Sequence, residues 1–160
     1  SKIKKALKKF LGIQRRFTKV FSVGKREFYD DYAHHPTEIR AVINSVRQVY
    51  KDRKIICVFQ PHRYSRVSAL KNEFALSFRF SDSVVLCPVY PAGEKIKYNF
   101  NQSRFSQLIS NKSKIQVINV KNQEELKNYF KKNLISNEIV ICMGAGSISN
   151  WIREIGNELK

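Results

Sequence analysis

Side chains that could bind an anion are concentrated in two short polar segments of the 160-residue chain. All three histidines of the sequence lie within residues 30–36 and 60–66. Arg63 and Arg66 are three residues apart, so at the start of a helix both guanidinium groups could grip one carboxylate or phosphate. A solvated helix end would carry the same residues, so the spacing leaves both interpretations open.

Other groups have a structural interpretation beside the chemical one. Asp30 and Asp31 precede a predicted helix, where carboxylates often serve only to cap backbone N–H groups. His34 and His35 are adjacent, and neighbouring side chains rarely point at one ion, so the sequence predicts no metal site there. The Gly-Ala-Gly run at 144–146 resembles a dinucleotide fingerprint but lacks the acidic residue that should follow, which favours a turn of close approach.

The elements that position these segments follow from the hydrophobic pattern. Apolar runs of strand length occupy residues 54–59, 83–89, 115–120 and 138–143. Helical spacing predicts helices from Pro36 to Val49, around 70–78, around 105–109, at 124–132 and at 148–159. A Gly-Lys turn at 24–25 indicates a hairpin or two short strands within residues 19–29, and we expect a leading helix in residues 1–17.

Continuous apolar strands that alternate with helices predict a parallel sheet covered on both faces. The expected fold class is therefore α/β: a Rossmann-like, doubly wound, mostly parallel sheet with an N-terminal hairpin. In such sheets ligands bind outside the carboxyl ends of the strands. The loops at 30–36, 60–66, 90–94 and 143–147 are thus expected to converge on one edge.

Composition excludes several classes of protein. With 42% hydrophobic and 27% charged residues, the chain should be globular and not disordered. No apolar stretch approaches the roughly 20 residues of a membrane span, and the first residues carry no signal-peptide core. Cys57, Cys87 and Cys142 each lie in an apolar run, which predicts buried, reduced thiols. We therefore expect a soluble, cytoplasmic protein.

The chain is strongly basic, with 30 Lys and Arg against 13 Asp and Glu and a formal net charge of +17. Nucleic acid, an anionic membrane surface or an anionic small molecule would suit such a field. A nucleic-acid-binding module should interleave aromatic and basic residues on a strand face, or show a recognition helix. The aromatic residues fall mostly at core spacings, which makes nucleic acid the less favoured partner.

Four ordered motifs resemble the C-terminal domain of the Mur ligases. They are DDYAHHPTEI at residues 30–39, FQPHRYSR at 59–66, YPAGE at 90–94 and MGAG at 143–146. The resemblance covers essentially the whole chain, beginning with GIQRRF at 12–17, which is similar to the exit from the family's central domain. It implies that residues 1–17 are the end of, or linker from, a central ATP-binding domain and that 18–160 form the C-terminal domain.

The resemblance implies an ATP-dependent amide ligase of peptidoglycan synthesis. Within the family the motifs are most similar to those of enzymes that join L-alanine to UDP-N-acetylmuramate through an acyl phosphate. The alternative inside the family is a recycling ligase that adds a tripeptide to the same sugar nucleotide. Its second motif lacks the HRYSR string found here at 62–66.

The resemblance also implies roles for individual residues. Five of them match family positions around the incoming amino acid, its carboxylate and nearby substrate groups: Tyr32, His34, His62, Arg63 and Arg66. Arg16 matches a basic residue near the nucleotide phosphates. Asp30, or less favourably Asp31, matches the acid that accepts the ribose hydroxyls of ATP.

The sequence departs from the family pattern. The family's phosphate-binding loop, G-x-x-G-K-[ST], occurs nowhere in the 160 residues. Candidates for the family's carbamylated lysine and central-domain metal ligands are absent from the sequence as well. We therefore expect ATP and Mg²⁺ to be bound mainly by a missing central domain, beside a missing N-terminal UDP-sugar domain. The expectation for this fragment is no catalytic residue, no metal site and no ATP turnover on its own.

Overall fold

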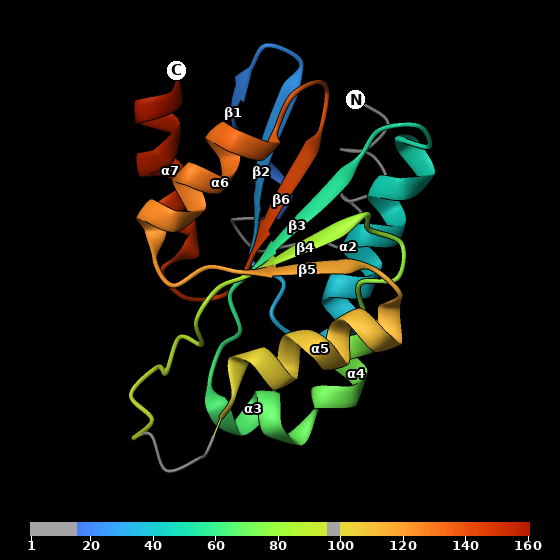
Figure 1. The fold of residues 1–160 in the computed structure, drawn as a ribbon, viewed down its shortest axis with the longest axis vertical. Coiled ribbons are helices and arrows are strands. Elements are labelled where there is room, and N and C mark those ends of the chain that lie inside the picture. The colour runs from blue at the N-terminus through green and yellow to red at the C-terminus, as the bar shows by residue number, and fades with distance from the viewer. Residues whose placement is uncertain (1–15, 96–99) are drawn as a thin grey trace.

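The computed structural model describes residues 16–95 and 100–160. Its sheet has six strands in the order β1-β2-β6-β3-β4-β5 (Figure 1). The strands are β1 (Thr18–Val23), β2 (Arg26–Asp31), β3 (Ile55–Phe59), β4 (Ser83–Leu86), β5 (Gln116–Asn119) and β6 (Ile139–Met143). β1 pairs antiparallel with β2, and each of the other pairings is parallel. The predicted hairpin and mostly parallel sheet are confirmed.

Helices cover both faces of the sheet, as the sequence predicts (Figure 1). The helices are α2 (Pro36–Val49), α3 (Tyr64–Ala69), α4 (Lys71–Leu76), α5 (Gln102–Ser113), α6 (Gln123–Asn133) and α7 (Ile148–Leu159). α6 and α7 pack on one face and the other helices on the opposite face. None of the helices in the described part of the chain is long and apolar enough to cross a bilayer.

Each central strand contributes side chains to two hydrophobic cores. Cys57 and Phe59 of β3 face the core under α2, whereas Val58 faces the core under α6 and α7. Successive side chains of a strand point to opposite faces, so a strand buried on both sides reads as an uninterrupted apolar run. All three cysteines are buried and unpaired, as predicted, and burial raises the pKa of the Cys57 thiol to about 12.

Several boundaries differ from the sequence prediction. The helix expected around 70–78 is two short helices, because Leu70 leaves helical geometry at φ −119° between α3 and α4. The strand expected at 83–89 ends at Leu86. Asp30 and Asp31, expected in a loop, are the last two residues of β2. The leading helix expected in residues 1–17 lies outside the described residues, except for its last two positions.

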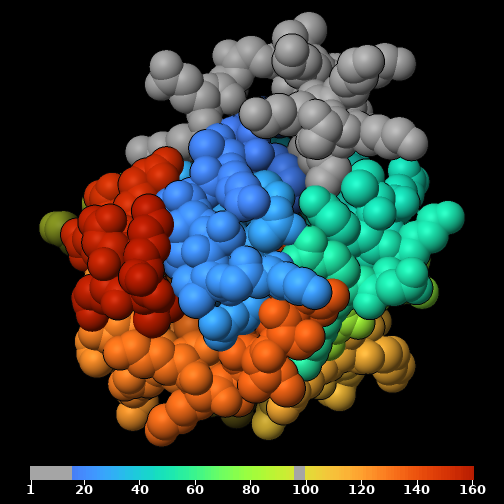
Figure 2. Space-filling view, turned by 90° about the horizontal axis from the view of Figure 1, so that it is seen from above, coloured from blue at the N-terminus to red at the C-terminus, as the bar shows by residue number. Residues whose placement is uncertain are grey.

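The hairpin is anchored by aromatic packing against α7. The rings of Phe21 and Phe28 stack with centroids 4.1 Å apart. A Cβ at Gly156 of α7 would lie 2.5 Å from the Phe21 ring, so only glycine lets the helix come this close. Figure 2 shows the hairpin lying beside α7 on the face that carries the amino ends of the parallel strands.

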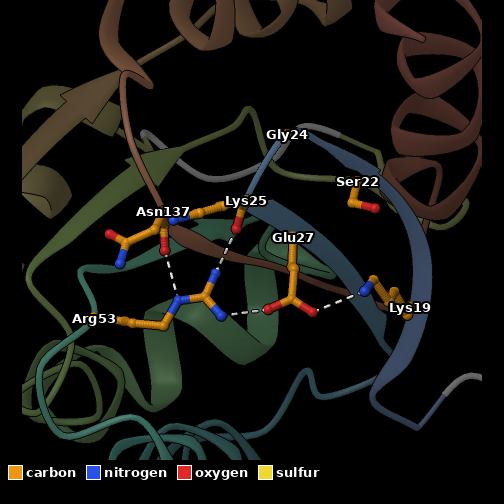
Figure 3. Close-up of a pocket in the computed structure, with 7 residues that line it drawn as sticks. All are labelled: Lys19, Ser22, Gly24, Lys25, Glu27, Arg53 and Asn137. Carbon is orange, nitrogen blue, oxygen red and sulfur yellow. Dashed lines mark hydrogen bonds and ion pairs between the residues drawn. The ribbon is translucent and has the colours of Figure 1, made fainter.

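A polar cavity of about 370 Å³ lies at this amino end (Figure 3). The Glu27 carboxylate accepts hydrogen bonds from Lys19, at 2.8 Å, and from Arg53. Arg53 also donates to the carbonyl oxygens of Lys25, at 2.7 Å, and Asn137, at 2.6 Å. Glu27 and Arg53 thereby tie the hairpin to the segments that lead into β3 and β6. Because Glu27 neutralises charge inside this cavity, we assign it a structural role.

We predict that Glu27→Gln lowers the free energy of unfolding by about 1–3 kcal/mol at neutral pH, because Arg53 loses its charged partner. Burial alone would raise the pKa of Glu27, but hydrogen bonds from Lys19 and Arg53 outweigh burial and hold the pKa below its usual value. This stabilisation is therefore present above the ordinary Glu pKa and is lost as pH falls through the lower folded-state pKa. Urea unfolding at neutral and acidic pH measures both effects.

The matched control is Glu124→Gln, which removes a carboxylate that is 66% exposed and paired with Lys127. Exposed pairs contribute little, so its effect should stay below about 0.5 kcal/mol. Equal effects of the two substitutions at neutral pH would contradict the role given to Glu27.

Candidate functional site

The carboxyl ends of the central strands are level with one another. Met143, the last residue of β6, pairs with Asp31 of β2 on one side and with Phe59 of β3 on the other. Hydrogen bonds continue past the strands, from the Gln60 amide to the Met143 carbonyl at 3.0 Å and from the Gly144 amide to the Asp31 carbonyl at 3.2 Å. The loops that follow these strands therefore begin side by side, as the sequence predicts.

In the loop after β2, the polar contacts of His34 fix its ring. Its Nδ1 lies 2.8 Å from the Tyr32 carbonyl oxygen, and its ring meets the Tyr32 ring edge-on at 4.9 Å. A carbonyl oxygen only accepts, so Nδ1 carries a proton, and Nε2 is the nitrogen that offers a lone pair when the ring is neutral. His35 instead caps α2, accepting a hydrogen bond from the Thr37 amide. His34 is thus held at the loop after β2, whereas His35 has a capping role.

The loop after β3 brings His62 and Arg66 to the same place. The His62 ring lies 5.8 Å from that of His34, and its Nδ1 is 3.3 Å from Nη1 of Arg66. Burial and the neighbouring positive charges, Arg66 first, lower the pKa of His62. The neutral ring accepts from the guanidinium through Nδ1, which leaves Nε2–H as a donor. One imidazole therefore offers an acceptor and the other a donor.

Arg63 stands just before α3, in the left-handed region at φ 68°. This backbone conformation is uncommon for a residue other than glycine, and its amide donates to the Tyr90 carbonyl at 2.8 Å. Its side chain is exposed, whereas the Arg66 side chain is half-buried against His62. The structure thus brings Tyr32, His34, His62 and Arg66 together and sets Arg63 at their margin.

The loop after β4 supports the loop after β3. Its contacts come from residues to which the sequence analysis gave no role. Glu94 accepts hydrogen bonds from the hydroxyl and, at 3.2 Å, from the amide of Ser65. The Tyr90 ring stacks on His62 with centroids 5.6 Å apart. The available signal was the YPAGE motif itself, which follows a strand at the ligand edge.

The loop after β6 is a turn of close approach, as predicted. Gly144 has φ 156°, and a Cβ there would lie 2.9 Å from the Gln60 carbonyl oxygen. Gln60, also given no role from sequence, donates to the Ser147 hydroxyl at 2.9 Å and accepts from the Ile148 amide at 3.0 Å. Its side chain therefore caps α7, whose own N-cap residue makes no such bond.

Asp30 and Asp31 are buried at the end of a strand, where hydrogen bonds satisfy both oxygens of Asp31. Among the described residues, Oδ1 of Asp30 has no hydrogen-bond partner. Asp31 faces α2, and its two oxygens accept from the amides of Phe17 and Ala33, both at 2.8 Å. Burial raises the pKa of Asp31 to about 6, against the opposing effects of those bonds and of the Arg16 charge. The predicted contact of Asp31 with ribose remains a prediction.

Asp30 faces the other side of the sheet and is fully buried. It accepts hydrogen bonds from the Ser149 hydroxyl at 2.6 Å and from Arg153 at 3.2 Å, both on α7. The two carboxylates therefore face opposite sides of the sheet. A ribose contact by Asp30 also remains a prediction.

Within residues 16–95 and 100–160, no group of three or more His, Cys, Asp or Glu side chains is placed to hold a metal ion. No chemical step is therefore assigned to a metal ion held by this part of the chain alone.

A family model for the Mur ligase, glutamate ligase domain, matches residues 15–146. The chain belongs to the Mur ligase family. The UDP-N-acetylmuramate–L-alanine ligase of Pelagibacter ubique is 52% identical to this Mur ligase chain over 153 residues, which is 96% of the chain and 33% of that protein. The enzyme of the same name from Sulfurihydrogenibium sp. is 40% identical over 147 residues, or 92% of the chain and 32% of that protein.

Structural comparison agrees with the sequence relatives. The crystal structure of UDP-N-acetylmuramate–alanine ligase from Thermotoga maritima superposes with a TM-score of 0.69 at 28% identity, covering 96% of this chain and 32% of that one. This Mur ligase chain therefore spans about a third of the length of the relatives it matches. The family and fold class expected from the sequence motifs are confirmed.

We predict that the Asp31 carboxyl titrates near pH 6, and that the amides of Phe17 and Ala33 shift with the same midpoint because they donate to it. The folded-state pKa lies above the ordinary value of 3.8, so the native state holds this proton longer than the unfolded state. The contribution of Asp31 to stability therefore falls as pH rises from about 4 to about 6. Carbon-detected and amide NMR titrations measure these midpoints.

The control is Asp31→Asn, which should abolish the shared transition in both amides. A carboxyl midpoint near 3.8 with pH-independent amides would show that Asp31 is solvated and does not clamp the start of the hairpin.

Proposed function

We propose that this chain is the amino-acid-binding, C-terminal domain of an ATP-dependent ligase that joins L-alanine to UDP-N-acetylmuramate. The observation that carries the proposal is the cluster of His34, His62 and Arg66 at the carboxyl edge of the sheet. The names of the relatives at 52% and 40% identity support the same substrates. They do not favour a tripeptide ligase or a nucleic-acid-binding module.

In this proposal Arg66 binds the carboxylate of L-alanine, with Arg63 approaching from the margin of the site. A planar guanidinium matches a carboxylate with two parallel hydrogen bonds. Because Nδ1 of His62 faces Arg66, its Nε2–H is left to donate to a substrate oxygen. Tyr32 borders the same space through its edge-on contact with His34.

His34 would orient the amine of L-alanine. Its Nε2 lone pair accepts a hydrogen bond from the neutral amine and leaves the nitrogen lone pair free to attack. Attack on the activated carboxyl carbon of the sugar nucleotide forms the amide bond as phosphate departs with the bonding electrons. The amine then transfers its extra proton to the departing phosphate.

The proposal assigns ATP and Mg²⁺ mainly to other domains of a longer ligase, because the phosphate-binding loop is absent from this sequence. Arg16 and one of Asp30 and Asp31 are retained as candidate nucleotide contacts. The same proposal makes residues 1–17 the end of a central domain and residues 18–160 the C-terminal domain. It also includes a cytoplasmic location.

In a full-length ligase that carries this chain, Arg66→Lys should raise the Michaelis constant for L-alanine at least roughly tenfold. Lysine keeps the charge but loses the bidentate match, which costs about 1.5–3 kcal/mol, and each 1.4 kcal/mol is about tenfold. The constant for ATP should stay within about twofold. Steady-state kinetics with each substrate varied in turn measures both.

Arg104→Lys on α5, an exposed arginine outside the cluster, is the matched control and should change neither constant. A rise in the ATP constant alone would place Arg66 at the nucleotide and refute the alanine assignment.

The isolated chain should not hydrolyse ATP, since phosphoryl transfer depends on positioned phosphates and magnesium. Magnesium-dependent phosphate release by the pure 160-residue chain, with both other substrates present, would contradict this prediction.

A further inference from the structure

Tyr90 holds the loops after β3 and β4 together through its backbone. Its amide donates to the Pro61 carbonyl, and its carbonyl accepts from the Arg63 amide, both at 2.8 Å. These bonds flank His62, which pairs with Tyr90 in an isolated parallel bridge. Tyr90 therefore supports the left-handed backbone of Arg63 and fixes where α3 begins.

The ring of Tyr90 continues this support at the level of side chains. It lies almost parallel to the His62 ring, with an interplanar angle of 17°. The edge of the His62 ring that carries Nδ1 faces Arg66. A ring that slid away would leave His62 free to rotate, and the guanidinium of Arg66 would lose a neighbour that fixes its direction.

The loop after β6 leaves the space that this ring needs. A Cβ at Gly146 would lie 2.4 Å from Cγ of Tyr90 and 2.8 Å from Oε1 of Gln60. Both contacts are shorter than side chains tolerate, so any larger residue would displace the ring. Although Tyr90 is 38% exposed, it is thus packed between His62 and Gly146.

We propose that Tyr90 is a positioning residue of the candidate site, which holds His62 and through it Arg66, and that Gly146 is required because its missing side chain admits the Tyr90 ring. Which amino acid binds at this site rests on the proposed function. The positioning itself concerns only groups of this chain.

The first test is histidine NMR on the 160-residue chain, whose three histidines give few signals. Tyr90→Phe keeps the ring and should leave the His62 signals and pKa unchanged. Tyr90→Leu removes the ring current and part of the burial. The ring protons of His62 should then move downfield, and its pKa should rise toward the ordinary value of 6.5.

Gly146→Ala should displace the same ring and reproduce the downfield shift while Tyr90 is intact. Tyr129→Leu, a tyrosine on α6 and so on the other face of the sheet, is the control and should leave His62 unchanged. Unchanged His62 signals in both Tyr90→Leu and Gly146→Ala would overturn the positioning role. Thermal unfolding of each variant confirms that it is folded.

The second test uses the full-length ligase. Tyr90→Leu should raise the Michaelis constant for L-alanine roughly two- to tenfold, which is the value of an aromatic stack, and leave that for ATP unchanged. Tyr90→Phe, which keeps the ring, should have the wild-type Michaelis constant for L-alanine. If Arg66→Lys impairs alanine use but Tyr90→Leu does not, the inference about Tyr90 is wrong and the proposed function stands. If Arg66→Lys has no effect while His62 responds to Tyr90→Leu, the proposed function is wrong and the positioning stands.

Discussion

The register of β6 between β2 and β3 is the constraint on which the candidate site depends. Met143 pairs with Asp31 and with Phe59, so three strands end at one level. A slip of one residue would turn every side chain of β6 to the opposite face and exchange the two cores. Since alternate residues of β6 pack into both cores, this register is strongly specified. The loops that follow the strands lie close together because of this register.

The two ends of the sheet use charge differently. At the amino end, Glu27 lies between Lys19 and Arg53, so the cations are partnered within the protein (Figure 3). At the carboxyl end, Arg66 rests on a neutral imidazole, which leaves its positive charge for an anionic ligand. Because of this difference, we propose the substrate site at the carboxyl end of the sheet and not at the cavity of the amino end.

The sequence predicted the fold and the convergence of the loops because apolar runs and helical spacing are local signals. It also predicted that His34, His62 and Arg66 would meet, since the carboxyl ends of parallel strands share an edge. It could not predict that Asp30 and Asp31 end a strand, because their burial depends on donors distant in the chain: the Phe17 amide for Asp31, and α7 for Asp30.

The supporting residues were missed for the same reason. The role of Tyr90 depends on a ring stack across two loops and on the space left at a third, and no spacing within one segment encodes either. The cap that Gln60 supplies to α7 likewise joins residues 88 positions apart. Sequence motifs therefore predict candidate ligand contacts more readily than the residues that hold those side chains in place.

The central claim is that the loops after β2, β3 and β4 form the amino-acid site. Amide chemical-shift mapping of the chain during titration with L-alanine tests it most directly, with acetate as the control for a carboxylate alone. We expect L-alanine to cause shifts confined to residues 32–35, 60–66 and 90–94, larger than those from acetate. Shifts centred instead on Lys25 and Arg53 at the amino end of the sheet would contradict it.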